Sequence, residues 1–236
     1  MVDKDLLSIQ EARSLVRAAR VAQAEFSQLG QERIDAVVKA VSEATAAQAE
    51  ALAVMANEET GYGKTHDKKI KNLLASEKVY ACIKDMKTVG ILREDKVNKI
   101  VEIAVPVGVI AGIIPSTNPT STVIYKSLIS LKAGNAIVFT PHPAAKKCIG
   151  RTVQIIKEAL HNCGVSTDLV SCISVPTMEG SAELMKIADL ILATGGPGMV
   201  KAAYSSGTPA LGVGAGNVPA FIERSADIKD AVTKIM

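Results

Sequence analysis

Short apolar runs alternate with longer amphipathic stretches from residue 109 onward, and this alternation restricts the possible folds more than any other feature. The runs with strand character cover residues 109–114, 136–139, 170–175, 189–193 and 209–212. The stretches with helix character cover residues 119–131, 143–163, 179–187 and 198–206. Strands that alternate with helices are typical of βαβ units. The sequence therefore predicts an α/β fold with a doubly wound, Rossmann-like parallel sheet.

The composition fits such a sheet and excludes some classes of partner. Hydrophobic residues make up 48% of the 236 residues, but aromatic residues only 3%, so small aliphatic side chains must form the core. Central parallel strands, buried on both faces, use such residues. A net charge of +3 gives no reason to expect binding to nucleic acid or to an anionic membrane. No run reaches the ~18 apolar residues of a membrane span, and no signal peptide is recognisable, so we expect a cytoplasmic protein.

The first 105 residues have a different pattern. Residues 6–58 have helical periodicity with a break at Gly30, residues 68–84 form a further predicted helix, and residues 99–105 alternate like a strand. We expect residues 1–105 to pack as helices and a strand on a cofactor-type domain formed by residues 106–236. Four lysines near the start of the third helix could attract phosphate, although a solvated face is the favoured interpretation. They are Lys64, Lys68, Lys69 and Lys71.

The four cysteines do not form a recognisable metal or disulfide pattern. Their spacings of 66, 15 and 9 residues include no CxxC pair, which argues against a zinc site. We expect free thiols and no bound metal. Each cysteine falls within a predicted helix or strand, so we expect all four to be buried as small apolar side chains. They are Cys82, Cys148, Cys163 and Cys172.

Three loops follow predicted strands, where ligands bind in parallel sheets. In residues 114–119, polar side chains precede Pro119 and could simply cap a helix, or they could direct amides at a carbonyl oxygen. In residues 140–143, His142 lies between two prolines and could form a rigid turn or hold a nucleotide. Residues 194–198 place glycines at the start of a helix, where free amides favour an anion. Each of these signals is weak when it is taken alone.

Taken together, three segments resemble the CoA-acylating aldehyde dehydrogenases. They are residues 106–147, 191–207 and the glycine-rich run 212–219. The nearest resemblance is to the acetaldehyde dehydrogenase half of bifunctional aldehyde–alcohol dehydrogenases. It implies an aldehyde-dehydrogenase fold and the reaction of an acetaldehyde-like aldehyde, CoA and NAD⁺ to acyl-CoA and NADH. In that reaction a cysteine thiolate attacks the aldehyde, and CoA takes the acyl group. The resemblance also implies a homo-oligomer for the full-length enzyme.

The resemblance assigns roles to residues of this sequence. Thr117 and Asn118 both match the oxyanion position, and the sequence does not decide between them. Lys126 matches a lysine near the catalytic centre of the wider superfamily. The expected cofactor-binding residues are Ile113, Ile114, Pro115, Ser116, Thr117, Asn118, Thr140, His142, Pro143, Thr194, Gly195, Gly196, Val213 and Gly214.

Departures from the wider superfamily refine the expected chemistry. Thr140 and Pro143 stand where hydrolytic members carry a lysine and a glutamate for the adenine ribose. Val213 stands where they carry a glutamate base, and valine cannot activate water, so the acyl group would go to a thiol. The matching position of the nucleophilic cysteine falls beyond Met236, so we expect this chain alone to be inactive. The alternatives are a non-catalytic nucleotide-binding module and an acyl-phosphate reductase, which the run 212–217 disfavours.

Overall fold

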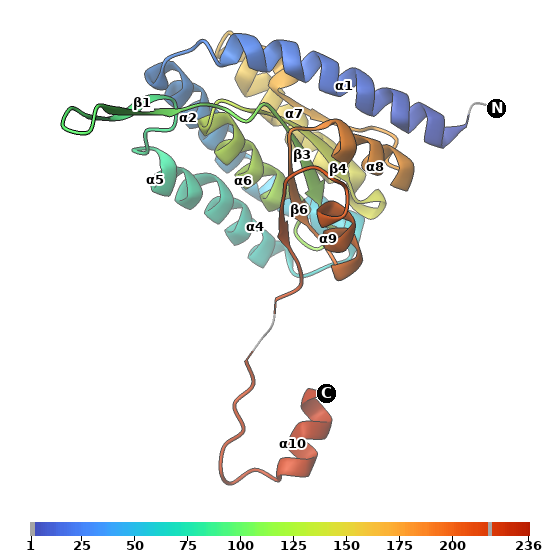
Figure 1. Cartoon of the computed structure of the whole chain (residues 1–236). Helices are drawn as coiled ribbons and strands as arrows, with labels where there is room; N and C mark the ends of the chain where they lie inside the picture. Colours follow the sequence, from blue (N-terminus) through green and yellow to red (C-terminus); the bar gives the residue numbers. More distant parts are fainter. Residues whose placement is uncertain (1–2, 217–218) are drawn as a thin grey trace.

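The computed structural model describes residues 3–216 and 219–236, and Figure 1 shows its helices and strands. The α-helices are α1 (Lys4–Phe26), α2 (Gln31–Ala47), α3 (Ala49–Thr60), α4 (Thr65–Leu73), α5 (Val79–Ile83), α6 (Pro119–Lys132), α7 (Lys146–Asn162), α8 (Met178–Ile187), α9 (Pro197–Tyr204) and α10 (Ile228–Ile235). The strands are β1 (Gly90–Asp95), β2 (Ile100–Ala104), β3 (Val109–Ile114), β4 (Ala136–Pro141), β5 (Val170–Cys172), β6 (Leu190–Thr194) and β7 (Ala210–Val213).

The main sheet contains five parallel strands in the order β5-β4-β3-β6-β7. The chain builds outward from β3 to β5, then returns to place β6 on the other side of β3. This reversal makes the boundary between β3 and β6 the topological switch point, where such sheets open a crevice. The predicted doubly wound parallel sheet is confirmed. Every residue of β3 and of β4 is buried, as their apolar sequences indicated.

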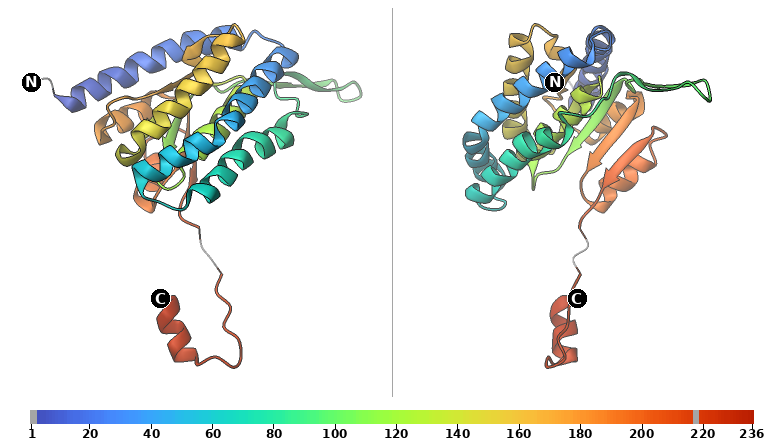
Figure 2. Two further views of the ribbon diagram at one scale, coloured as in Figure 1. Left: turned by 180° about the vertical axis from the view of Figure 1, so that it is seen from behind. Right: turned by 90° about the vertical axis from the view of Figure 1, so that its left-hand side faces the viewer.

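Helices cover both faces of the sheet, as the two views in Figure 2 show. Helices α6 and α7 pack on one face, and α2 packs against both of them from outside. Helices α1 and α8 pack on the opposite face and against each other. The amino-terminal helices α1 and α2 therefore belong to the helical layers that cover the two faces of the sheet. Two-sided coverage explains why the central strands are apolar on both faces.

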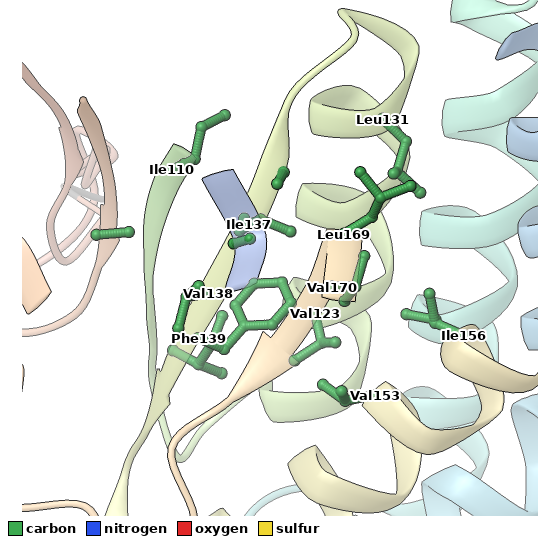
Figure 3. Close-up of a cluster of buried hydrophobic side chains, with 14 of the residues drawn as sticks. Ile110, Val123, Leu131, Ile137, Val138, Phe139, Val153, Ile156, Leu169 and Val170 are labelled. Atoms are coloured by element: carbon green, nitrogen blue, oxygen red, sulfur yellow. The ribbon is translucent and has the colours of Figure 1, made fainter. Parts of the chain in front are cut away.

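The core between the sheet and α6 and α7 is formed by aliphatic side chains around one aromatic ring (Figure 3). Phe139 of β4 is fully buried and lies among Val123, Val153 and Val170. Its ring also crosses close to Gly112 on the neighbouring strand: a Cβ added at that glycine would lie 2.4 Å from Phe139 Cδ1. Glycine at this position therefore allows the phenyl ring to sit against the centre of β3.

The structure differs from the sequence prediction outside the sheet. The predicted strand at 99–105 is β2, and it pairs with β1, which the sequence did not reveal, in an antiparallel hairpin that extends from the body (Figure 1). The predicted helix at 68–84 consists of α4, a π-helical turn at Leu74–Lys78, and α5. Helix α10 was not predicted either; it carries no buried residue and lies apart from the sheet.

Two further properties concern the described part of the chain as a whole. None of the helices in residues 3–216 and 219–236 is both long and apolar enough to cross a bilayer. Within the same ranges, no group of three or more histidine, cysteine or acidic side chains is arranged to hold a metal ion.

Candidate ligand cleft

A cleft of about 940 Å³ opens at the carboxyl ends of the strands of the main sheet. Its walls come from the loops that follow β3, β4, β5, β6 and β7, because parallel strands all end at the same edge. All fourteen residues expected to bind cofactor line this one cleft. They are Ile113, Ile114, Pro115, Ser116, Thr117, Asn118, Thr140, His142, Pro143, Thr194, Gly195, Gly196, Val213 and Gly214. Residues as far apart in the sequence as Ile113 and Gly214 therefore lie in one cleft.

The turn between β3 and α6 is held by lysines rather than by helix capping. Asn118 occupies the position before α6, but its side chain makes no capping hydrogen bond. Instead its Oδ1 accepts a hydrogen bond from Lys71 Nζ at 3.0 Å, and the carbonyl oxygen of Thr117 accepts one from Lys68 Nζ at 3.0 Å. Lys68 is only 5% exposed, and burial lowers the pKa of its ammonium group. The expected solvated face was therefore wrong for Lys68.

The loop after β4 combines a buried hydroxyl pair with a rigid turn. Thr140 Oγ1 lies 2.7 Å from Ser181 Oγ, and the Ser181 hydroxyl donates to the carbonyl oxygen of Thr177 at 2.8 Å. His142 Nδ1 accepts a hydrogen bond from the amide of Ala144 at 3.1 Å and caps the short 3₁₀ helix Pro143–Ala145. His142 therefore forms the rigid turn and also lines the cleft, so the two interpretations of this residue are compatible.

Two glycine-containing loops form the opposite wall. The amide of Gly195 donates to the carbonyl oxygen of Val213 at 3.2 Å and so links the ends of β6 and β7. Gly196 precedes α9 and makes no side-chain cap. Pro197 has no N–H, and the amide of Met199 donates to the carbonyl oxygen of Gly196 at 3.0 Å, so in the first turn the Gly198 amide is left without a bond to the described residues. A Cβ added at Gly196 or Gly214 would meet no protein atom within 4 Å. Asn217 and Val218, which belong to the glycine-rich run, lie outside the described residues.

Sequence reasoning missed the wall formed by the β5–α8 connection and by α9. The cleft residues that it missed are Pro141, Pro176, Thr177, Met178, Ser181, Met199, Ala215 and Gly216. Thr177 is a helix cap: its Oγ1 accepts from the amide of Gly180 at 3.0 Å. The signal was present, because the predicted strand at 170–175 ends at the same edge as the other strands. Because this strand is parallel to the others, the loop that follows it could be predicted to lie in the same cleft.

Lys126 lies beneath the cleft rather than in its wall. It is 1% exposed, and its Nζ donates to the carbonyl oxygens of Ile113 at 2.8 Å and Leu192 at 2.7 Å. It therefore ties β3 to β6 at the switch point. Burial without a carboxylate partner lowers its pKa to about 7.

The cysteines lie away from the cleft, since none is among its described lining residues. Cys148 is buried as expected, and burial, followed by the nearby Glu59, raises its thiol pKa to about 12. Burial likewise raises the pKa of Cys172 to about 12. The expectation of burial was wrong for Cys82, which is exposed on α5, and Cys163 and Cys172 are only partly buried. The raised pKa values make thiolates at Cys148 and Cys172 rare at neutral pH.

The fold defines a doubly wound α/β protein with a cleft at its topological switch point. The sequence model of the aldehyde dehydrogenase family matches residues 5–236. The chain belongs to the aldehyde dehydrogenase family.

Within this family, the chain is similar to acylating aldehyde dehydrogenases. The chain is 49% identical over 231 residues to the bifunctional aldehyde-alcohol dehydrogenase of Escherichia coli K12, covering 97% of this chain and 26% of that protein. It matches the crystal structure of an acetylating aldehyde dehydrogenase from Geobacillus thermoglucosidasius with a TM-score of 0.92 and 54% identity, covering 99% of this chain and 52% of that one.

A second similar structure contains a bound ligand. It is the propionaldehyde dehydrogenase of Rhodopseudomonas palustris with bound CoA and an acylated cysteine, with a TM-score of 0.77 and 34% identity, covering 87% of this chain and 47% of that one. The chain thus spans about half the length of the solved structures that it matches, and about a quarter of the bifunctional relative.

Proposed function

We propose that this chain provides the NAD(H)- and CoA-binding part of a CoA-acylating aldehyde dehydrogenase that acts on small, acetaldehyde-like aldehydes. The observation that carries the proposal is that all fourteen residues expected from the sequence to bind cofactor line one cleft. The acetylating relatives and the CoA-bound propionaldehyde dehydrogenase support CoA as the acyl acceptor. When bound, the nicotinamide cofactor would accept the hydride, and the residues of the cleft would bind and orient the cofactor.

The cleft offers suitable groups for a dinucleotide. The free amide of Gly198 in the first turn of α9 and the positive end of the helix dipole favour a pyrophosphate. Packing within the protein does not require glycine at Gly196 or Gly214, because a Cβ there would meet no protein atom. Close approach of a ligand to the backbone is the remaining reason for these glycines. The hydroxyls of Thr140 and Ser181 are placed to bond a ribose.

Val213 supports acyl transfer to a thiol rather than to water. It ends β7 and lines the cleft at the position that matches the glutamate base of hydrolytic members. An aliphatic side chain cannot take a proton from water, so a thioester on the enzyme would persist until CoA enters. The valine therefore supports an acylating enzyme rather than a hydrolytic one.

The reaction also needs a thiolate nucleophile, which we propose is none of the four cysteines of this sequence. They lie outside the described cleft lining, and Cys148 and Cys172 have raised pKa values. The 236-residue chain is therefore expected to form no NADH above background from acetaldehyde, CoA and NAD⁺. The measurement is absorbance at the NADH band with purified chain. CoA-dependent NADH formation would contradict this assignment.

The second candidate is a non-catalytic nucleotide-binding module, which the position of the cysteines also favours. The two candidates differ when the rest of an acylating enzyme is supplied. We expect a chimera of this chain with the remaining half of the Geobacillus relative to oxidise acetaldehyde only when CoA is present. A folded chimera that binds NADH but does not turn over would favour the module.

A further inference from the structure

Three side chains on one face of α4 bond to the turn between β3 and α6 or to the start of α6. Lys68, Lys71 and Asn72 are spaced i, i+3 and i+4, which places them on the same side of the helix. Lys68 donates to the carbonyl oxygen of Thr117, and Lys71 donates to the Oδ1 of Asn118. These contacts join residues almost fifty positions apart in sequence.

The third contact fixes the helix itself against the turn. Asn72 is fully buried; its Oδ1 accepts from the Thr120 hydroxyl at 2.8 Å, and its Nδ2 donates to the carbonyl oxygen of Ala49 at 2.9 Å. Thr120 lies in the first turn of α6, and Ala49 begins α3. Helix α4 is thus bonded to both α3 and α6. These bonds fix the position of its lysine ammonium groups next to the turn.

The bond from Lys71 determines which end of the Asn118 amide faces the ligand. An ammonium group can only donate, so the carbonyl oxygen of the amide must face Lys71. The NH₂ group then lies on the other side, and Nδ2 makes no hydrogen bond with the described residues. Because Asn118 lines the cleft and does not cap α6, this NH₂ group is left as a donor for a ligand.

We propose that Lys71 is a positioning residue that orients the Asn118 amide so that its NH₂ group donates to a carbonyl oxygen of the bound ligand. The proposal rests on the proposed function and favours Asn118 over Thr117 as the donor. The carbonyl oxygen belongs either to the nicotinamide carboxamide or to the aldehyde. Without Lys71, the amide could rotate and present its oxygen to the cleft, where it would repel the ligand oxygen.

The side-chain amide signals of Asn118 in ¹⁵N-labelled full chain test the orientation directly, without activity. They are assigned by their loss in Asn118→Asp. We expect Lys71→Met to shift or broaden them, whereas Lys71→Arg, which keeps a donor, leaves them near their wild-type positions. Lys69→Met is the matched control, because Lys69 lies on the same helix but bonds to Glu50 at 2.8 Å. Unchanged signals in Lys71→Met, or the same change in Lys69→Met, would overturn the proposal.

Ligand affinities then show which carbonyl oxygen accepts the bond. If the nicotinamide accepts it, Lys71→Met weakens NADH binding about threefold to tenfold, the usual effect of losing one hydrogen bond, but leaves ADP-ribose binding unchanged. If both affinities are unchanged while the amide signals move, the acceptor is the aldehyde. A wild-type chain that binds no NADH would refute the proposed function, and the amide signals would still decide the role of Lys71.

Discussion

The ammonium group of Lys126 illustrates what a single side chain does in this fold. It lies in the interior, where its two hydrogen bonds go to the carbonyl oxygens of Ile113 and Leu192, on neighbouring strands. These carbonyl groups belong to β3 and β6, the paired strands on either side of the switch point, so the lysine links the two strands beneath the cleft. Among the described residues no carboxylate bonds to it, and burial lowers its pKa from 10.5 to about 7.

This lowered pKa predicts how the stability changes with pH. Between pH 7 and 10.5 the unfolded chain keeps the lysine proton that the folded chain has lost, so raising the pH stabilises the folded state. From pH 7 to 9 the free energy of unfolding of the wild type should rise by about 2 kcal/mol relative to Lys126→Met. Urea unfolding across this range measures the difference. A difference that stays constant with pH would contradict the interior placement of the charge.

At the scale of elements, the contact between β3 and β4 depends on a missing side chain. A Cβ at Gly112 would lie 2.4 Å from the Phe139 ring and 3.2 Å from Ile137 Cδ1. Both of these side chains are buried, and so is every residue of the two strands. We expect Gly112→Ala to lower the free energy of unfolding by about 1–3 kcal/mol through overpacking.

The same substitution elsewhere provides the control. Gly150 lies inside α7, and an added Cβ would meet no atom within 4 Å. Gly150→Ala should therefore stabilise the protein by about 0.5–1 kcal/mol, because alanine loses less entropy than glycine in a helix. Thermal or urea unfolding of both variants measures the contrast. Equal effects of the two substitutions would refute the packing described for β3.

The elements of the sheet could be predicted because each strand is a short apolar run between turn residues. The prediction failed where the pairing partner decides the structure. The predicted strand 170–175 ends at Cys172, because the amides of Ser174 and Val175 donate to Glu11 of α1 instead of to a strand. Strand β1 was missed because its residues are exposed and their pairing with β2 alone makes them a strand.

At the scale of the whole molecule, the sequence predicted which loops surround the cleft better than it predicted the bonds that hold those loops in place. The ends of parallel strands converge whatever their sequence separation, so loops after strands could be placed together. The bonds from Lys68 and Lys71 to the turn at Thr117 and Asn118 join helices and loops whose relative positions follow from the whole packing. A run of lysines on a predicted helix gives no local signal for such long-range bonds, and the sequence alone therefore favours a solvent-exposed face for these lysines.

The central claim is that this cleft binds a nicotinamide dinucleotide, and a fluorescence titration with NADH tests it most directly. We predict saturable binding by the wild type and loss of binding in Gly196→Leu, whose side chain would fill the cleft. Gly30→Leu is the matched control: Gly30 precedes a helix with nearly the same backbone conformation as Gly196, and an added Cβ would meet no protein atom within 4 Å, but it lies outside the cleft lining, so this variant should bind like the wild type. Absence of binding by the wild type, or equal binding by all three proteins, would contradict the account.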